Sequence, residues 1–114
     1  MRTKLLRRRA AVVCRLEGDL DFRAKDALEA CLAQLGGGQR VVFDISGAPM
    51  VDSAGLAALL DSVRRLRATG GNAVISCRQP SVQKMLRAVV VPSSASLFDD
   101  TEDAMSYLLP AQAA

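Results

Sequence analysis

Runs of β-branched and apolar residues recur along the chain at the length of β-strands. In one of them Val41, Val42 and Phe43 follow one another without a polar residue between them. A consecutive run of this kind predicts a central strand that is covered on both faces. The strands expected from the pattern are residues 10–16, 40–45, 72–77 and a shorter stretch at 96–98.

Between these strands, apolar residues recur every three or four positions, which places them on one face of a helix. The first helix is expected over residues 22–35, with Asp21 as its N-cap and glycines 36–38 as its end. The apolar stripe of this helix consists of Leu28, Cys31, Leu32 and Leu35.

Three more helices are expected from the same spacing. The second runs from Ser53 or Ala54 to about Thr69, and the third begins near Pro80. The fourth begins in the acidic sequence at residues 100–103, which resembles a capped helix start. The inward residues are Leu56, Leu59, Leu60, Val63 and Leu66 in the second helix, Val82, Met85, Leu86 and Val89 in the third, and Ala104, Tyr107 and Leu108 in the fourth.

Strands and helices alternate along the whole chain, which predicts βαβ units with right-handed crossovers. We therefore expect one α/β domain over residues 1–114, with a mostly parallel sheet of four or five strands and about four helices. Residues 1–9 are basic and are expected to form an arm or an edge strand. Residues 2–8 would pair antiparallel in that case, although the arginines at 7–9 make a poor hairpin turn.

The composition narrows the class of protein. The formal net charge is +3, and much of the surplus lies in the N-terminal arginines and lysine, without aromatics or a nucleic-acid-binding motif beside them. We therefore expect no direct contact with nucleic acid. No apolar run approaches the roughly 20 residues of a membrane helix, and no signal peptide is visible. The expectation is a bacterial-type cytoplasmic protein that does not insert into membranes.

The side chains that usually carry catalysis are missing. The chain has no histidine, no pattern of paired carboxylates and no phosphate-binding loop, so we expect no enzymatic activity and no cofactor. Cys14, Cys31 and Cys77 are far apart in sequence and lie in apolar surroundings, which favours buried thiols over a metal site. A redox pair among them stays open, because sequence spacing alone does not place two sulfurs within bonding distance.

One serine combines exposure with a helix start. The strand at residues 40–45 leads through a loop to Ser53, at the first turn of the second helix. A serine there serves as an N-cap, worth about 1 kcal/mol. A phosphate on it would add about −1.5 to −2 charges, which the helix N-terminus favours by about 0.3–1 kcal/mol. Asp52 opposes that charge, so phosphorylation should change partner binding more than folding.

Three segments resemble a known family: residues 18–21 (GDLD), 41–47 (VVFDISG) and 51–56 (VDSAGL). They are similar to the STAS domain, in particular to bacterial anti-sigma factor antagonists, over about residues 12–109. The resemblance implies that Ser53 is phosphorylated by a GHKL-type anti-sigma factor that is also a serine kinase. It also implies that the unphosphorylated protein binds this kinase and frees a sigma factor for transcription, and that a PP2C-type phosphatase resets it.

The resemblance also implies a partner-binding surface. We expect a monomer or a weak dimer, although the sequence leaves the oligomeric state open. Ala54 stands where many members have a second hydroxyl residue, and residues 89–94 depart from the family pattern. The implied partner-binding residues are Asp19, Asp21, Asp52, Ser53, Ala54, Gly55 and Leu56.

Two other functions stay open. Residues 51–57 also resemble STAS accessory subunits that do not switch and that dock on another protein, such as the ATPase of a lipid-transport complex. A domain that binds a small ligand or nucleotide would place its site at the loop ends of the sheet, but no phosphate-binding loop supports it.

Overall fold

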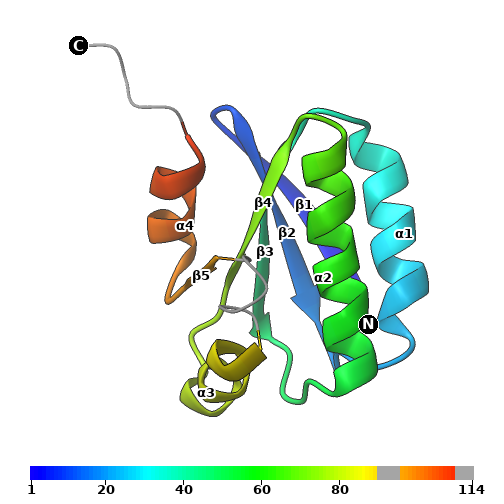
Figure 1. Cartoon of the computed structure of the whole chain (residues 1–114), viewed down its shortest axis with the longest axis vertical. Helices are drawn as coiled ribbons and strands as arrows, with labels where there is room; N and C mark the ends of the chain where they lie inside the picture. Colours follow the sequence, from blue (N-terminus) through cyan, green and yellow to red (C-terminus); the bar gives the residue numbers. More distant parts are fainter. Residues whose placement is uncertain (90–95, 110–114) are drawn as a thin grey trace.

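The chain forms a five-stranded sheet with helices on both faces (Figure 1). The computed structural model describes residues 1–89 and 96–109. The strands lie in the order β1-β2-β3-β4-β5; β1 pairs antiparallel with β2 and every other neighbouring pair is parallel. The elements are β1 (Arg2–Arg8), β2 (Ala11–Glu17), α1 (Ala24–Leu35), β3 (Arg40–Gly47), α2 (Ser53–Ala68), β4 (Asn72–Ser76), α3 (Pro80–Val89), β5 (Leu97–Phe98) and α4 (Thr101–Leu108). This confirms the expected α/β class and the mostly parallel sheet.

The sheet separates two apolar clusters. In β3, Val41 and Phe43 face the helices α1 and α2, whereas Val42 faces α4. All three side chains are fully buried, so β3 is the doubly covered central strand that its consecutive apolar run predicts. Figure 1 shows α1 and α2 side by side on one face and α4 on the other.

The basic N-terminus forms the edge strand β1, one of the two expected alternatives. Its register runs from Arg2 opposite Glu17 to Arg8 opposite Ala11. The expectation of a poor hairpin was wrong, because Arg9 takes a left-handed conformation, with φ 55°, at the turn. That conformation costs roughly 1–2 kcal/mol, which the seven paired positions of β1 and β2 offset. The arginine side chains of the turn lie in solvent, where their charge also protects the sheet edge.

Two details of the helices differ from expectation. The prediction that Tyr107 faces inward is wrong: its side chain is 56% exposed, and its ring lies tilted against Phe98 at 5.2 Å between centroids. The short α4 buries one stripe, at Ala104, Met105 and Leu108, and Tyr107 falls beside that stripe. The side chain of Val89 lies outside the described part of the chain. None of the helices in residues 1–89 and 96–109 is long and apolar enough to cross a membrane.

Candidate functional site

Two loops meet at the carboxyl ends of the neighbouring parallel strands β2 and β3. The backbone N–H of Leu20, in the β2–α1 loop, donates to the carbonyl of Met50 at 2.8 Å. The N–H of Asp52 donates to the carbonyl of Leu20 at 3.1 Å, which makes an isolated parallel bridge between Leu20 and Val51. The β3–α2 loop is therefore held against the β2–α1 loop just before Ser53.

Asp52, not Ser53, caps helix α2. Its backbone is extended, and its Oδ1 accepts a hydrogen bond from the N–H of Gly55 at 2.8 Å. The expectation that Ser53 caps this helix was wrong, because Ser53 is already the first helical residue and its side chain is exposed. The N–H groups of Ser53 and Ala54 have no acceptor within the helix, as in any first turn. The Ser53 hydroxyl is thus free of the capping role and lies beside two backbone donors.

We expect Asp52→Ala to lower the free energy of unfolding by about 1 kcal/mol, since it removes the side-chain cap of α2. Urea titration followed by circular dichroism measures this loss. The control is Ser53→Ala, which should change the free energy of unfolding by less than about 0.5 kcal/mol, because an exposed N1 hydroxyl caps nothing. Equal losses in the two variants would contradict the assignment of the cap to Asp52.

Gly55 lets helix α2 approach the β2–α1 loop. A Cβ atom on Gly55 would lie 1.9 Å from the carbonyl oxygen of Leu20 and 2.7 Å from the backbone N of Asp21. Both neighbours are backbone atoms that are fixed by the paired loops, so no side-chain rotation relieves the overlap. Leu56 then turns into the core and is 6% exposed. These two residues set where Ser53 sits.

Asp21 is bound to Arg23 rather than to the helix terminus. Its Oδ1 accepts from the backbone N–H of Arg23 at 3.0 Å, and its Oδ2 accepts from Nη2 at 2.7 Å. These hydrogen bonds hold the pKa of the Asp21 carboxyl below its usual range. The expectation that Asp21 caps a helix from residue 22 was wrong. Residues 22 and 23 form a turn instead, and α1 begins at Ala24 without a side-chain cap.

The structure brings all seven expected partner-binding residues to one end of the sheet, but they differ in exposure. Ser53 and Ala54 are exposed. Asp19 and Asp52 are half-buried. The buried members of the set are Asp21, Gly55 and Leu56.

Sequence reasoning missed the most exposed apolar groups at this end. The Phe22 ring is 74% exposed and Met50 is 41% exposed, although both residue types are usually buried. The guanidinium of Arg23 lies 6.0 Å from the centre of the Phe22 ring. Periodicity assigned Phe22 to the first helix, and only its position in a polar loop sequence could have marked it as exposed. Large apolar groups in loops beside a candidate modification site are typical of a contact surface.

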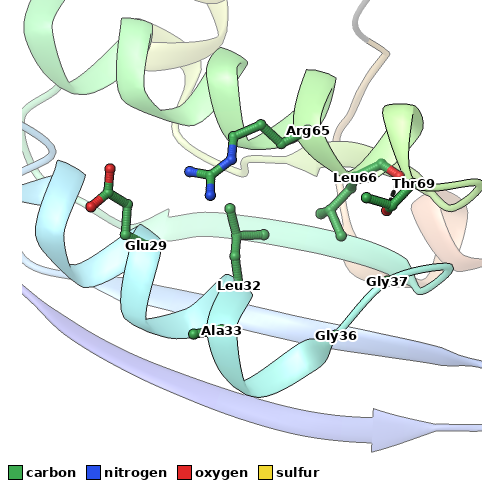
Figure 2. Close-up of a pocket in the computed structure, with 8 residues that line it drawn as sticks. All are labelled: Glu29, Leu32, Ala33, Gly36, Gly37, Arg65, Leu66 and Thr69. Carbon is green, nitrogen blue, oxygen red and sulfur yellow. Dashed lines mark hydrogen bonds between the residues drawn. The ribbon is translucent and has the colours of Figure 1, made fainter.

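A groove between α1 and α2 starts beside these residues. Near Phe22 and Ala54 it is a hollow of about 380 Å³, with Lys25 and Asp61 on its walls. Further along, a second hollow of about 230 Å³ continues it to the loop after α1. Figure 2 shows this part, where Glu29 of α1 and Arg65 of α2 point toward one another above Leu32. Both hollows share Glu29 and Arg65, so they form one α1–α2 groove.

The groove does not have the donors of a metal centre. Within residues 1–89 and 96–109, no three histidine, cysteine, aspartate or glutamate side chains lie where they could hold a metal ion together. The groups exposed at this end include the Ser53 hydroxyl, the apolar side chains of Phe22 and Met50, and the charged side chains around them. This combination suits contact with another macromolecule better than a reaction on a small substrate.

This fold is similar to that of several solved structures. Similar solved structures include an anti-sigma factor antagonist from Mycobacterium paratuberculosis, 19% identical, which covers 94% of this chain and 92% of that chain with a TM-score of 0.77. Phosphorylated SpoIIAA, a Bacillus cell fate determinant, is 21% identical. The match covers 95% of this chain and 100% of that chain, with a TM-score of 0.63. The murine anion transporter Slc26a9 is 17% identical, and 90% of this chain matches 18% of that chain with a TM-score of 0.74.

At these identities the structural matches establish the fold alone. No curated protein matches the sequence significantly. The family model of the STAS domain, however, matches residues 3–104, from the second residue of β1 to the first half of α4. This match agrees with the motifs at residues 18–21, 41–47 and 51–56, and the chain belongs to the STAS domain family.

Proposed function

We propose that this STAS domain is an anti-sigma factor antagonist that is controlled by phosphorylation of Ser53. In its unmodified form it binds a GHKL-type anti-sigma factor kinase and so frees a sigma factor for transcription. Phosphorylation of Ser53 releases it, and a PP2C-type phosphatase restores the binding form. The observation that carries the proposal is the exposed Ser53 hydroxyl, which is free because Asp52 caps the helix.

The phosphoryl transfer needs only an acceptor from this chain. The kinase would move the γ-phosphoryl group of ATP to Oγ of Ser53, and the hydroxyl proton would leave to a base on the kinase. ADP and phosphoserine are the products. The two free N–H groups of the first turn and the helix dipole then favour the phosphate by about 0.3–1 kcal/mol, whereas Asp52 repels it. Because these opposing effects are small, the fold is expected to tolerate the modification.

The same charge has a larger effect in an interface. Ser53 precedes the exposed Ala54, which lines the α1–α2 groove together with Phe22, and the exposed Met50 lies in the same β3–α2 loop. We propose that these apolar groups anchor the partner, since buried aromatic and thioether side chains contribute much of the energy of an interface. A phosphate of about −1.5 to −2 charges at the centre of such a contact would lose its water without gaining a partner charge.

In this proposal the remaining site residues hold the groups around Ser53 in place or add charge beside it. Gly55 and Leu56 fix the start of α2, and Asp21 holds Arg23 beside Phe22. Asp19 and Asp52 are half-buried and add negative charge at the edge of the surface. The protein then works in the cytoplasm by binding, with no catalysis or cofactor of its own.

Incubation with the GHKL-type anti-sigma factor kinase of the same organism and Mg-ATP tests the proposal. Intact mass should rise by about 80 daltons, the mass of one phosphoryl group, and peptide mapping should place the gain on Ser53. The gain should disappear in Ser53→Ala and persist in the control Ser81→Ala, an exposed serine in the first turn of α3. A gain that persists in Ser53→Ala would refute the assigned acceptor.

A second candidate is a STAS accessory subunit that docks on a transporter, such as the ATPase of a lipid-transport complex, without switching. The match of this chain to 18% of an anion transporter chain favours it, since the fold also occurs as part of a transport protein. This role needs no phosphorylation. Absence of any mass gain with the kinase, together with binding to a transporter component that Ser53→Asp leaves unchanged, would favour the accessory role.

A further inference from the structure

Two cysteines that are distant in sequence meet in the core. Cys14 lies in the middle of β2 and Cys31 in the second half of α1, 17 positions later. Their Sγ atoms are 3.1 Å apart, about 1 Å more than the length of a disulfide bond. Cys14 is 0% exposed and Cys31 is 1% exposed, so the pair sits between the sheet and the helix.

The two thiols are chemically different because they share one hydrogen bond. The hydrogen bond from Cys14, together with a smaller contribution from the Thr3 hydroxyl, lowers the pKa of Cys31. The same contact and burial raise the pKa of Cys14. Cys31 is therefore the better nucleophile of the pair, and Cys14 is the thiol that can attack Cys31 once that sulfur is oxidised.

The third cysteine has none of this arrangement. Cys77 follows β4 and its Sγ lies 3.9 Å from the carbonyl oxygen of Gln79. Burial raises its pKa. It is as buried as the pair, but it lacks a neighbouring thiol within the described residues, so it serves as an internal control.

We propose that Cys14 and Cys31 form an oxidation site, which a hydroperoxide such as hydrogen peroxide converts into an intramolecular disulfide. The Cys31 sulfur attacks one peroxide oxygen, the O–O bond breaks, and sulfenic acid and water result. The Cys14 sulfur then attacks the sulfenic sulfur, an S–S bond forms and a second water leaves. Two thiols are oxidised by two electrons in total, and one peroxide is reduced to two waters.

The surrounding fold allows this step. The sulfurs need to approach by only about 1 Å, so β2 and α1 keep their places. Access runs along the sheet edge, because Thr3 belongs to β1, the outermost strand, and edge strands open locally more readily than central ones. The disulfide would tie the second strand to the first helix and should raise the melting temperature by roughly 10 °C, since it closes a loop of moderate length.

Mass spectrometry of the folded protein after exposure to dilute hydrogen peroxide tests the site. The expected result is a loss of about 2 daltons, a tryptic peptide pair joined through Cys14 and Cys31, and full recovery of the starting mass with a thiol reductant. The Cys77→Ala variant should give the same result. Cys31→Ala should lose the 2-dalton change and gain about 16 daltons or nothing.

Wild-type protein alone suffices to refute the proposal, so a variant that fails to fold does not block the test. A peptide pair that includes Cys77, a covalent dimer, or the addition of oxygen without the 2-dalton loss would overturn it. So would unchanged mass under conditions that oxidise the chain unfolded in urea. The site is independent of Ser53, and its outcome does not bear on the phosphorylation proposal.

Discussion

Ser53→Asp should weaken binding to the anti-sigma factor kinase by about 10-fold or more, which is at least about 1.4 kcal/mol. The new carboxylate would stand at the exposed start of α2, next to the half-buried Asp52 carboxylate. An interface that covers it would remove its water and leave it unpaired beside a like charge. Isothermal titration calorimetry of the two purified proteins with ADP present measures the effect.

The controls separate charge from shape. Ser53→Ala removes the hydroxyl without adding charge, and its affinity should stay within about 3-fold of wild type. Ser81→Asp adds the same charge at another exposed first-turn serine, on α3, and should also bind like wild type. If Ser53→Asp binds as tightly as both controls, charge at residue 53 has no influence on this partner.

Gly55→Ala should lower the free energy of unfolding by about 3 kcal/mol or more, or prevent folding. The added methyl group would overlap the Leu20 carbonyl oxygen, at 1.9 Å, and this oxygen already accepts the hydrogen bond from Asp52. Relief requires α2 to move away from the β2–α1 loop, which breaks the bridge between Leu20 and Val51. Urea unfolding, or the melting temperature of a soluble fraction, measures the loss.

Gly37→Ala is the matched control for this substitution. Its Cβ would lie 3.4 Å from the Thr69 side chain, which is an ordinary contact, so the free energy of unfolding should change by less than about 1 kcal/mol. A Gly55→Ala protein as stable as Gly37→Ala would mean that the loops yield easily. In that case they would not hold Ser53 in a fixed place.

Much of the fold follows from sequence pattern. The consecutive Val41, Val42 and Phe43 predict a strand buried on both faces, and periodic leucines predict α1 and α2 to within two residues at either end. Strand order and the antiparallel β1 are harder. Arg9 enters a left-handed turn that propensity disfavours, because the pairing of whole strands outweighs one strained residue.

The site could be predicted in position but not in detail. A serine between a strand and an apolar helix marks the place, yet Asp52 and Ser53 are both good caps, and only coordinates show which side chain bonds to Gly55. Asp21 likewise has two partners within reach, and the charged Arg23 competes with the helix terminus. The approach of Gly55 to Leu20 joins segments 35 positions apart, so no local pattern signals it.

The contact between Cys14 and Cys31 could not be predicted from the sequence either. Each cysteine lies in an apolar stripe, and each stripe predicts burial correctly. The distance between the sulfurs depends on how α1 lies across β2, which the stripes leave undetermined. The structure supplies this distance, 3.1 Å, and on it rests the proposal that the two thiols form a redox pair.

The affinity of fully phosphorylated protein for the anti-sigma factor kinase, compared with that of unmodified protein, tests the central claim most directly. A doubly negative phosphate at the first residue of α2 should reduce that affinity by about 100-fold or more, while the melting temperature moves by only a few degrees. Equal affinities of the two forms, measured at confirmed stoichiometric modification of Ser53, would contradict control of binding by this hydroxyl.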